Sequence, residues 1–366
     1  MPCPCLKAIW EILVFVGQRL NFPYKRTSLI YSKWGNIMKF RFLIFAALMM
    51  AVVYTPSANA KSDADFQVIL LGTGTPPPLF SRFGPATLVI AGKKRILFDA
   101  GRGVGIRLWQ DKIRFGSIDY LVLTHLHSDH VVGIPDIWLT GWLRSPFANR
   151  KGNFKVRGPV GTVSLMAGLR KAYDWDIQTR MADQNLPLKN VTVDAKDYGA
   201  NEVVIDEDGV KVTSIKVNHG AKIKPAFGYR IDYGGRSVVL SGDTKYNENL
   251  ADKAKGADLF IHHVAAAKPA LLKTKKFWKV ILAHHTSPED VGKVFSIAKP
   301  KMAAFTHLVL LTNGKIKPPS FKDLVTRTRT TYSGPLVVGK DRMRFIIGKD
   351  GVKVVQPPMS KKKMKK

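Results

Sequence analysis

The stretch LTHLHSDHVVG, residues 123–133, decides how the rest of the sequence is interpreted. It places His125, His127, Asp129 and His130 within six positions, directly after the β-type run Tyr120–Thr124. Two histidines that are two positions apart on extended backbone project to the same side. Neutral imidazole and carboxylate groups are ligands of zinc and related divalent ions. The stretch therefore predicts that the first two histidines hold one ion, and that the aspartate and third histidine address a second ion beside it.

Further ligands are expected at the ends of later strands. All nine histidines lie between His125 and His307, each at a predicted strand end or helix start. Two ions need more than four ligands, and His219, Asp243 and His307 each stand where a predicted strand gives way to a loop. We expect Asp243 to bridge the ions together with a hydroxide, although an aspartate at such a position is equally typical of a turn. The predicted metal ligands are His125, His127, Asp129, His130, His219, Asp243 and His307.

The composition indicates a folded α/β protein. Apolar residues make up 45% of the 366 residues, as in globular proteins, which argues against general disorder. Strand patterns come first in hairpin-like pairs and later alternate with helical patterns, which predicts an α/β sandwich with mixed sheets. No repeat or long linker interrupts them, so residues 61–356 are predicted to form one domain. The expected strands cover 66–71, 87–90, 95–98, 120–124, 154–157, 211–217, 227–232, 237–240, 259–262 and 302–306. The expected helices cover 134–143, 164–173, 288–297, capped by Ser287, and 321–327.

Residues 1–60 have the features of an export leader. From Met38 a basic start is followed by the apolar run Phe42–Tyr54 and by Ala58-Asn59-Ala60, the pattern of a cleaved signal peptide. Cleavage would leave a chain that begins at Lys61, in the periplasm or secreted. The apolar run is shorter than the roughly 20 residues of a membrane span, so no stable span is expected after cleavage, with an uncleaved anchor as the alternative. Residues 1–37 carry no pattern that we can interpret, and an over-long translation start would explain them.

Charge and cysteine content limit the partners and the ligands. The net charge is +31, and residues 1–60 hold seven basic residues and one acidic residue, which leaves +25 on residues 61–366. Such a field favours anionic partners, although a generally basic set of exported proteins explains it equally well, because the lysines are scattered. Only the tail 357–366, with its lysine run, is expected to be a solvated basic segment. Both cysteines, Cys3 and Cys5, lie in the leader, which excludes thiolate ligands in the predicted domain.

Together these motifs resemble the metallo-β-lactamase fold. The nearest branch is that of ribonuclease Z and the arylsulfatase-like hydrolases, because Val156–Thr162 is similar to the G-P-x-G-T turn of that branch and Pro225–Arg230 resembles its following strand. The resemblance covers about Phe66–Gly348. The motifs that carry it are Thr124–His130, Leu71-Gly72-Thr73-Gly74-Thr75-Pro76, Asp99-Ala100-Gly101, Ser241-Gly242-Asp243-Thr244 and Thr306-His307.

The resemblance implies an αβ/βα four-layer sandwich with two mixed sheets and two Zn²⁺ ions at one edge, Mn²⁺ being the alternative metal. By matching position, His125, His127 and His219 would hold one ion. Asp129, His130 and His307 would hold the other, with Asp243 between them.

The resemblance also implies a catalytic pair, Asp129 and His284. This branch has an H-x-T motif whose histidine donates a proton to the leaving group, and His284-His285-Thr286 provides the match, with Asp129 as the partner of His284. The other interpretation is that His284 caps the helix from Pro288, and His285 is given no role. One position departs from the branch: His263 stands where ribonuclease Z-like chains have the Glu that orients the proton donor.

Several functions fit this sequence. The first is an exported metal-dependent hydrolase of small anionic esters, either phosphodiesters or aryl and alkyl sulfates. The alternative is a ribonuclease Z that processes the 3′ ends of transfer RNA. It fits the fold and the charge, but not the leader, because transfer RNA is cytoplasmic, and no long Gly/Pro-rich basic insertion resembles the arm that grips transfer RNA. A lactonase and a non-enzymatic binder of anionic polymers are further alternatives.

The expected partner is thus a small anionic ester, with nucleic acid as a less favoured one, and the chain is compatible with a homodimer. Residues 142–152 are a candidate for the pocket wall. There Trp142 and Phe147 would either stack on a substrate ring or pack in the core.

Overall fold

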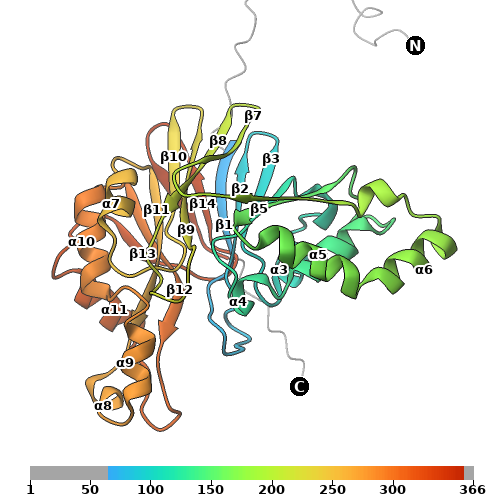
Figure 1. Cartoon of the computed structure of the whole chain (residues 1–366). Helices are drawn as coiled ribbons and strands as arrows, with labels where there is room; N and C mark the ends of the chain where they lie inside the picture. The colour runs from blue at the N-terminus through green and yellow to red at the C-terminus, as the bar shows by residue number, and fades with distance from the viewer. Residues whose placement is uncertain (1–64, 358–366) are drawn as a thin grey trace, which may run out of the picture. The chain divides into compact units, whose positions relative to one another are not determined.

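The computed structural model describes residues 65–357 (Figure 1). The predicted leader and the lysine-rich residues of the tail lie outside these residues, so their predictions are untested. Within the described part of the chain, no helix has the length and apolar character needed to cross a membrane.

The first sheet has eight strands in the order β15-β14-β1-β2-β3-β4-β5-β6. Its first five strands pair antiparallel, and β3 to β6 pair parallel, so the sheet is mixed. The strands are β1 (Phe66–Gly72), β2 (Ala86–Ala91), β3 (Lys94–Phe98), β4 (Tyr120–Val122), β5 (Phe154–Pro159), β6 (Val193–Tyr198), β14 (Arg344–Ile347) and β15 (Val352–Val355).

The second sheet has seven strands in the order β13-β12-β11-β10-β9-β8-β7. Strands β10 to β13 pair parallel and β7 to β10 pair antiparallel, so it is mixed as well. The strands are β7 (Val203–Glu207), β8 (Val210–Lys216), β9 (Phe227–Tyr233), β10 (Arg236–Leu240), β11 (Leu259–Ala266), β12 (Met302–Leu310) and β13 (Leu336–Val338).

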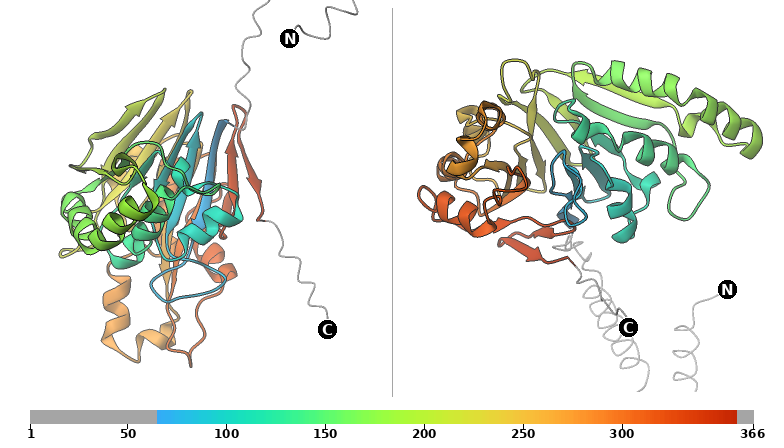
Figure 2. Two further views of the ribbon diagram at one scale, coloured as in Figure 1. Left: turned by 90° about the vertical axis from the view of Figure 1, so that its right-hand side faces the viewer. Right: turned by 90° about the horizontal axis from the view of Figure 1, so that it is seen from below.

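Helices cover the outer face of each sheet, and Figure 2 shows the resulting layers edge-on. Alternate side chains of both sheets, such as Val68 and Ile231, form the core between them. The opposite faces pack on helices, with Trp138 on the first sheet and Phe295 on the second. This confirms the predicted αβ/βα sandwich with two mixed sheets. The helical elements are α3 (Val104–Gln110), η2 (Phe115–Ser117), α4 (Ser128–Val131), η3 (Asp136–Thr140), α5 (Thr162–Ala172), α6 (Asp174–Gln184), η4 (Leu188–Asn190), α7 (Glu248–Lys253), α8 (Pro269–Leu272), α9 (Lys276–Leu282), α10 (Pro288–Ala298) and α11 (Phe321–Thr328).

All ten expected strands are present, but five further strands were missed. Four of them, β6, β7, β13 and β15, are the edge strands of the two sheets, and β14 lies next to an edge. β13 and β15 have only three and four residues, which is too short for a clear period-2 pattern, and β6 contains three charged residues. The four expected helical regions are also present, and the Ser287 side chain caps α10 by accepting from the Asp290 N–H. Helix α3 was missed because it begins at a left-handed glycine, Gly103, without a side-chain cap.

Candidate metal centre and active site

The seven predicted ligands come from both sheets and meet at one edge of the sandwich. His125 and His127 follow β4, Asp129 and His130 lie on α4, and the other three side chains come from the second sheet. His219 follows β8, Asp243 follows β10, and His307 lies within β12. Because the parallel strands β4, β10 and β12 end at the same edge, residues far apart in sequence come together there.

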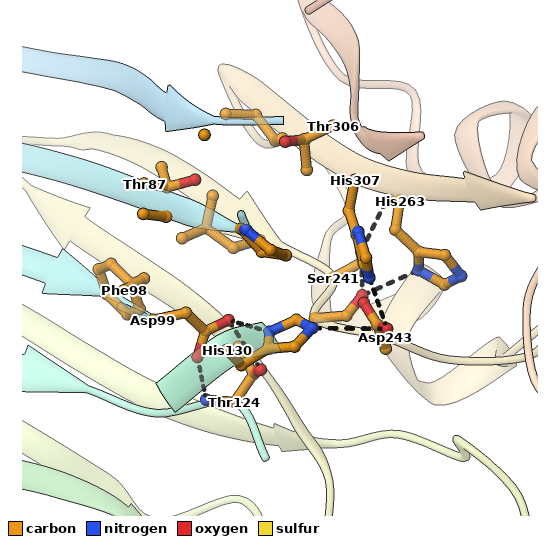
Figure 3. A pocket seen from close by; sticks show the side chains of 16 residues that line it. Thr87, Phe98, Asp99, Thr124, His130, Ser241, Asp243, His263, Thr306 and His307 are labelled. Carbon is orange, nitrogen blue, oxygen red and sulfur yellow. Dashed lines mark hydrogen bonds and ion pairs between the residues drawn. The ribbon is translucent and has the colours of Figure 1, made fainter. Parts of the chain in front are cut away.

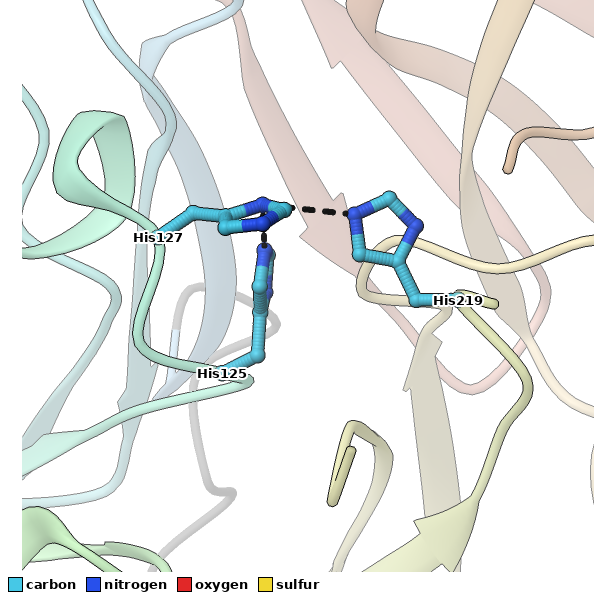
Figure 4. A group of neighbouring side chains, drawn as sticks. All are labelled: His125, His127 and His219. Atoms are coloured by element: carbon cyan, nitrogen blue, oxygen red, sulfur yellow. Dashed lines mark hydrogen bonds between the residues drawn. The ribbon is translucent and has the colours of Figure 1, made fainter. Parts of the chain in front are cut away.

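His125, His127 and His219 form the first group (Figure 4). The Nε2 atom of His125 lies 2.9 Å from Nδ1 of His127, which lies 3.4 Å from Nε2 of His219. Ligands that sit about 2.0–2.1 Å from a tetrahedral zinc are about 3.3 Å apart. The remaining ring nitrogens of His125 and His219 are held by Thr124 Oγ1, at 3.0 Å, and by the His284 carbonyl oxygen, at 2.9 Å. Such outer contacts fix the orientation of metal-binding imidazoles.

Asp129, His130 and His307 form the second group. The Asp99 carboxylate accepts a 2.8 Å hydrogen bond from Nδ1 of His130 and two more from the N–H and hydroxyl of Thr124 (Figure 3). Asp99 therefore aims Nε2 of His130 into the site. That atom is buried, has no hydrogen-bond partner, and lies 3.7 Å from the carboxylates of both Asp129 and Asp243. A buried ring nitrogen that faces two carboxylates without a partner suits a metal ligand.

Asp243 lies between the two groups. Its Oδ2 atom is 3.0 Å from Nε2 of His307, 3.7 Å from Nε2 of His130 and 3.7 Å from Nε2 of His219. One carboxylate oxygen thus approaches ligands of both groups, as the predicted bridging role requires.

A β-bulge directs His307 into the site. In the pairing of β11 with β12, His263 is opposite Thr306 and Val264 is opposite Leu308, so His307 is the extra residue. It takes a left-handed backbone conformation, with φ 41°, which is strained for a residue with a side chain. Its Nδ1–H donates to the Gly74 carbonyl oxygen at 2.7 Å, which leaves Nε2 for Asp243. Bulges that re-aim one side chain are common beside active sites.

The electrostatics of these groups suit a bound cation. Burial lowers the pKa of His125 well below the ordinary histidine value, and it also lowers the pKa values of His127 and His219, so all three are neutral, as ligands must be. Burial alone would lower the pKa of His130 as well, but the Asp99 and Asp243 carboxylates outweigh it and raise that pKa well above the ordinary value. These carboxylates favour a cation at His130, and a bound metal ion would take the place of the proton. The donor set of imidazoles and carboxylates, arranged as two groups with Asp243 between them, fits divalent ions such as zinc.

His263, the residue in place of the usual Glu, is a buried connector. Its Nδ1–H donates to the Gly242 carbonyl oxygen at 2.9 Å, and its Nε2 accepts from the Thr286 N–H at 3.3 Å. Burial lowers its pKa well below the ordinary value, so it is neutral. His263 thus joins the turn that carries Asp243 to the segment that carries His284 and His285. The substitution is visible in the sequence, but this role is not.

The structure places both members of the histidine pair beside the site. The His284 ring packs near Gly220, and its backbone carbonyl orients His219. His285, to which sequence analysis gave no role, points further inward: its Nδ1 is buried without a hydrogen-bond partner, 3.9 Å from Oδ2 of Asp243. It also groups with His219 and Asp243 as potential ligands. No local sequence signal identifies this role, because the direction of the His285 ring depends on tertiary contacts.

A groove of about 220 Å³ opens beside the half-buried His127 and is lined by Lys222 and Lys224 among others. Two exposed lysines at this position suit an anionic substrate. Trp142 and Phe147, the aromatic residues of the expected pocket wall, do not line this groove. Trp142 is 1% exposed and donates from its indole to the Pro187 carbonyl oxygen, so it belongs to the core. Phe147 packs edge-on against Trp109.

Comparison with known proteins agrees with this fold. Residues 94–308 match the beta-lactamase superfamily domain. Ribonuclease Z of Mycobacterium bovis is 32% identical over 278 residues, which are 76% of this chain and 97% of the relative. Ribonuclease Z of Mycolicibacterium paratuberculosis is 35% identical over 246 residues, 66% of this chain and 86% of the relative.

Solved structures share the fold at lower sequence identity. The metallo-beta-lactamase fold protein YhfI from Bacillus subtilis has a TM-score of 0.58 at 18% identity, over 76% of this chain and 98% of that one. The short form of human tRNase Z has a TM-score of 0.53 at 20% identity, over 80% and 100%. Zinc-bound PqqB from Methylobacterium extorquens has a TM-score of 0.54 at 16% identity, over 76% and 99%. The chain therefore belongs to the metallo-β-lactamase hydrolase family, among the homologues of ribonuclease Z.

Proposed function

We propose that this protein is a metal-dependent phosphodiesterase that cleaves RNA. The observation that carries the proposal is the complete ligand set, two groups of three side chains with Asp243 between them, in a chain that aligns with 97% of a ribonuclease Z. The likeness to ribonuclease Z favours the nuclease alternative over the hydrolysis of small sulfate esters.

The residues of the site suggest how the reaction proceeds. His125, His127 and His219 would hold one divalent ion, and Asp129, His130 and His307 would hold the other. Together the two ions would supply a nucleophilic water at neutral pH and compensate the charge of the phosphodiester. Lys222 and Lys224 would attract the phosphate from the groove beside His127.

The histidine pair would supply the proton for the departing oxygen. Burial lowers the pKa of His285 to about 3 in the protein alone. A phosphodiester anion beside the ring would favour its protonated form and raise this pKa. Proton donation of this kind is worth about 10²- to 10⁴-fold in rate.

Parallel assays test the proposed function. The purified full chain, supplied with zinc or manganese, would be assayed on a labelled RNA with a single-stranded 3′ extension, bis(p-nitrophenyl) phosphate, p-nitrophenyl sulfate and a lactone, each with and without chelator. We expect cleavage of the RNA and the phosphodiester that chelation or Asp243→Ala abolishes. Turnover of the sulfate or the lactone alone would assign the site to that ester class. Metal binding with no turnover of any substrate would overturn the enzymatic proposal.

A further inference from the structure

An acid-free projection stands beside the site. Helices α8 and α9 and the loop that follows β12 extend together beyond the end of the second sheet, in both Figure 1 and Figure 2. The two segments begin side by side, because they follow neighbouring strands: Ala266, the last residue of β11, is paired with Leu310, the last residue of β12. We call this the lysine ridge and define it by its exposed lysines, Lys268, Lys273, Lys275, Lys276, Lys279, Lys315 and Lys317.

Little opposes the charge of the lysine ridge. Between Asp258 and Asp323 the sequence contains only two acidic residues, Glu289 and Asp290. Glu289 is paired with Arg327 and Asp290 with Lys293, neither of which is a ridge lysine. Asp323 interacts electrostatically with one ridge lysine, Lys268. Seven like charges on one projection create a positive local field, which attracts an anionic partner.

Aromatic side chains lie among these lysines. Phe277 is 58% exposed, between Lys276 and the indole of Trp278, and the two rings are 5.2 Å apart in an edge-on arrangement. The Trp278 indole N–H donates to the Thr274 hydroxyl at 3.1 Å, which fixes the ring. Exposed rings interleaved with cations are the features with which proteins bind single-stranded nucleic acid, since the rings stack on bases and the cations contact phosphates.

The lysine ridge leads directly into the segment that carries His284 and His285. Helix α9 ends at Leu282, whose carbonyl oxygen accepts from the His285 N–H, and the His284 N–H donates to Ile281. A chain held along α9 would therefore reach the site where the proton donor stands. From the exposed lysines, the exposed ring and this continuity, we infer that the lysine ridge binds the single-stranded part of an RNA substrate and guides it into the site. This inference deepens the proposed function and rests on it.

Binding of a fluorescein-labelled 12-nucleotide oligouridylate to the full, zinc-loaded chain tests the inference, by anisotropy over a series of salt concentrations. The test variant is Lys275→Ala/Lys276→Ala/Lys279→Ala. We expect about tenfold weaker binding, and a salt slope that falls by about 2, since each lost phosphate contact with a single strand removes about 0.7. Phe277→Ala should weaken binding about fivefold or more through the lost stacking, and the KM for RNA cleavage should rise with the dissociation constant.

Lys171→Ala/Lys189→Ala/Lys349→Ala is the matched control, because it removes the same charge from exposed positions elsewhere. It should bind the RNA within twofold of the unaltered chain. Equal losses in both triple variants would show an effect of net charge alone and would overturn the inference, as would unchanged binding in the ridge variant. Lysine-dependent binding to phosphatidylglycerol vesicles in place of RNA would assign the ridge to a membrane surface. If RNA binds through the ridge but no phosphodiester is cleaved, the proposed function fails while the binding inference stands.

Discussion

At the scale of single residues, Asp243 is the point at which the two groups of ligands meet. Its Oδ2 atom lies within 3.9 Å of ring nitrogens of His130, His219, His285 and His307. Burial opposes its ionisation, but the neighbouring His307 and His130 hold the pKa of this carboxyl well below its usual range. Asp243 therefore remains an anion in a buried place, where it can attract a cation.

The proton donor can be assigned by comparing two neighbouring variants. His285→Ala is expected to lower kcat on RNA, which has a poor leaving group, by about 10²-fold or more, because Nδ1 of His285 faces the site. On bis(p-nitrophenyl) phosphate, whose leaving group needs no proton, the loss should be small. His284→Ala is the matched variant. If it alone loses RNA cleavage, the assignment to His284 from sequence is the right one.

His262 should make folding stability depend on pH. Burial lowers its pKa to about 4, its Nε2 has no hydrogen-bond partner, and its ring packs near Phe295. An unfolded histidine has a pKa of about 6.5, so between these values the unfolded chain binds more protons than the folded chain, and stability falls as the pH falls. At pH 5 the cost is about 2 kcal/mol.

This effect can be measured with His262→Leu. The drop in the free energy of unfolding from pH 7 to pH 5 should be about 2 kcal/mol smaller in the variant than in the unaltered chain. Urea titrations at both pH values supply the numbers. An equal drop in both proteins would show that His262 is not the group that titrates.

The sequence predicted most of the site because its signals are local. The spacing of His125, His127, Asp129 and His130 within one turn requires no knowledge of distant contacts. The inward direction of His285 and the connecting role of His263 could not be predicted, because they depend on the pairing of β11 with β12 and on the packing of Thr286. Such tertiary contacts leave no periodic trace in the chain.

At the scale of elements, Asp341 fastens the loop after β1 to α3. Its carboxylate accepts from the Thr73 N–H and hydroxyl, from the Phe83 N–H and from the Arg107 guanidinium, and it is only 7% exposed. The same loop supplies the Gly74 carbonyl that orients His307. The contact thus stabilises the fold and also the second group of ligands.

Asp341→Ala is expected to cost about 3–5 kcal/mol of unfolding free energy, because it removes the only carboxylate that is paired with the buried Arg107 guanidinium in the described part of the chain. Urea denaturation would measure the loss, with Asp350→Ala as an exposed control that should change stability by about 0.5 kcal/mol or less. A loss below about 1 kcal/mol would show that water or a neighbouring group replaces the carboxylate.

At the scale of the whole molecule, ion binding should stabilise the fold. An ion that binds only the folded chain raises the free energy of unfolding. The increase is about 4 kcal/mol when the concentration of the free ion is about 1,000 times its dissociation constant. Chelation is therefore expected to lower the midpoint of thermal unfolding by about 10 °C. Calorimetry with and without chelator would measure this shift, and Asp243→Ala should show a much smaller one. An unchanged midpoint would contradict a metal centre formed by these ligands.

We propose that the whole protein is exported from the cytoplasm and that its leader is cleaved between Ala60 and Lys61. The basis is the basic and apolar pattern that starts at Met38 and ends at Ala58-Asn59-Ala60. Mass spectrometry of the N-terminal peptide from fractionated cells should find a chain that starts at Lys61, outside the cytoplasm. An intact leader on cytoplasmic protein would overturn the export proposal and would place the RNA substrate inside the cell.

The division of the ligands between the two sheets has a mechanical consequence. Four of the ligands follow a strand of the first sheet, and three come from the second sheet. Ions bound between them would resist any motion that separates the two sheets. With the ions in place, backbone amides of β4 and β12 should exchange their hydrogens with deuterated solvent only through one shared opening event. Without the ions, each half could open by itself, and the two strands would lose their common exchange rate.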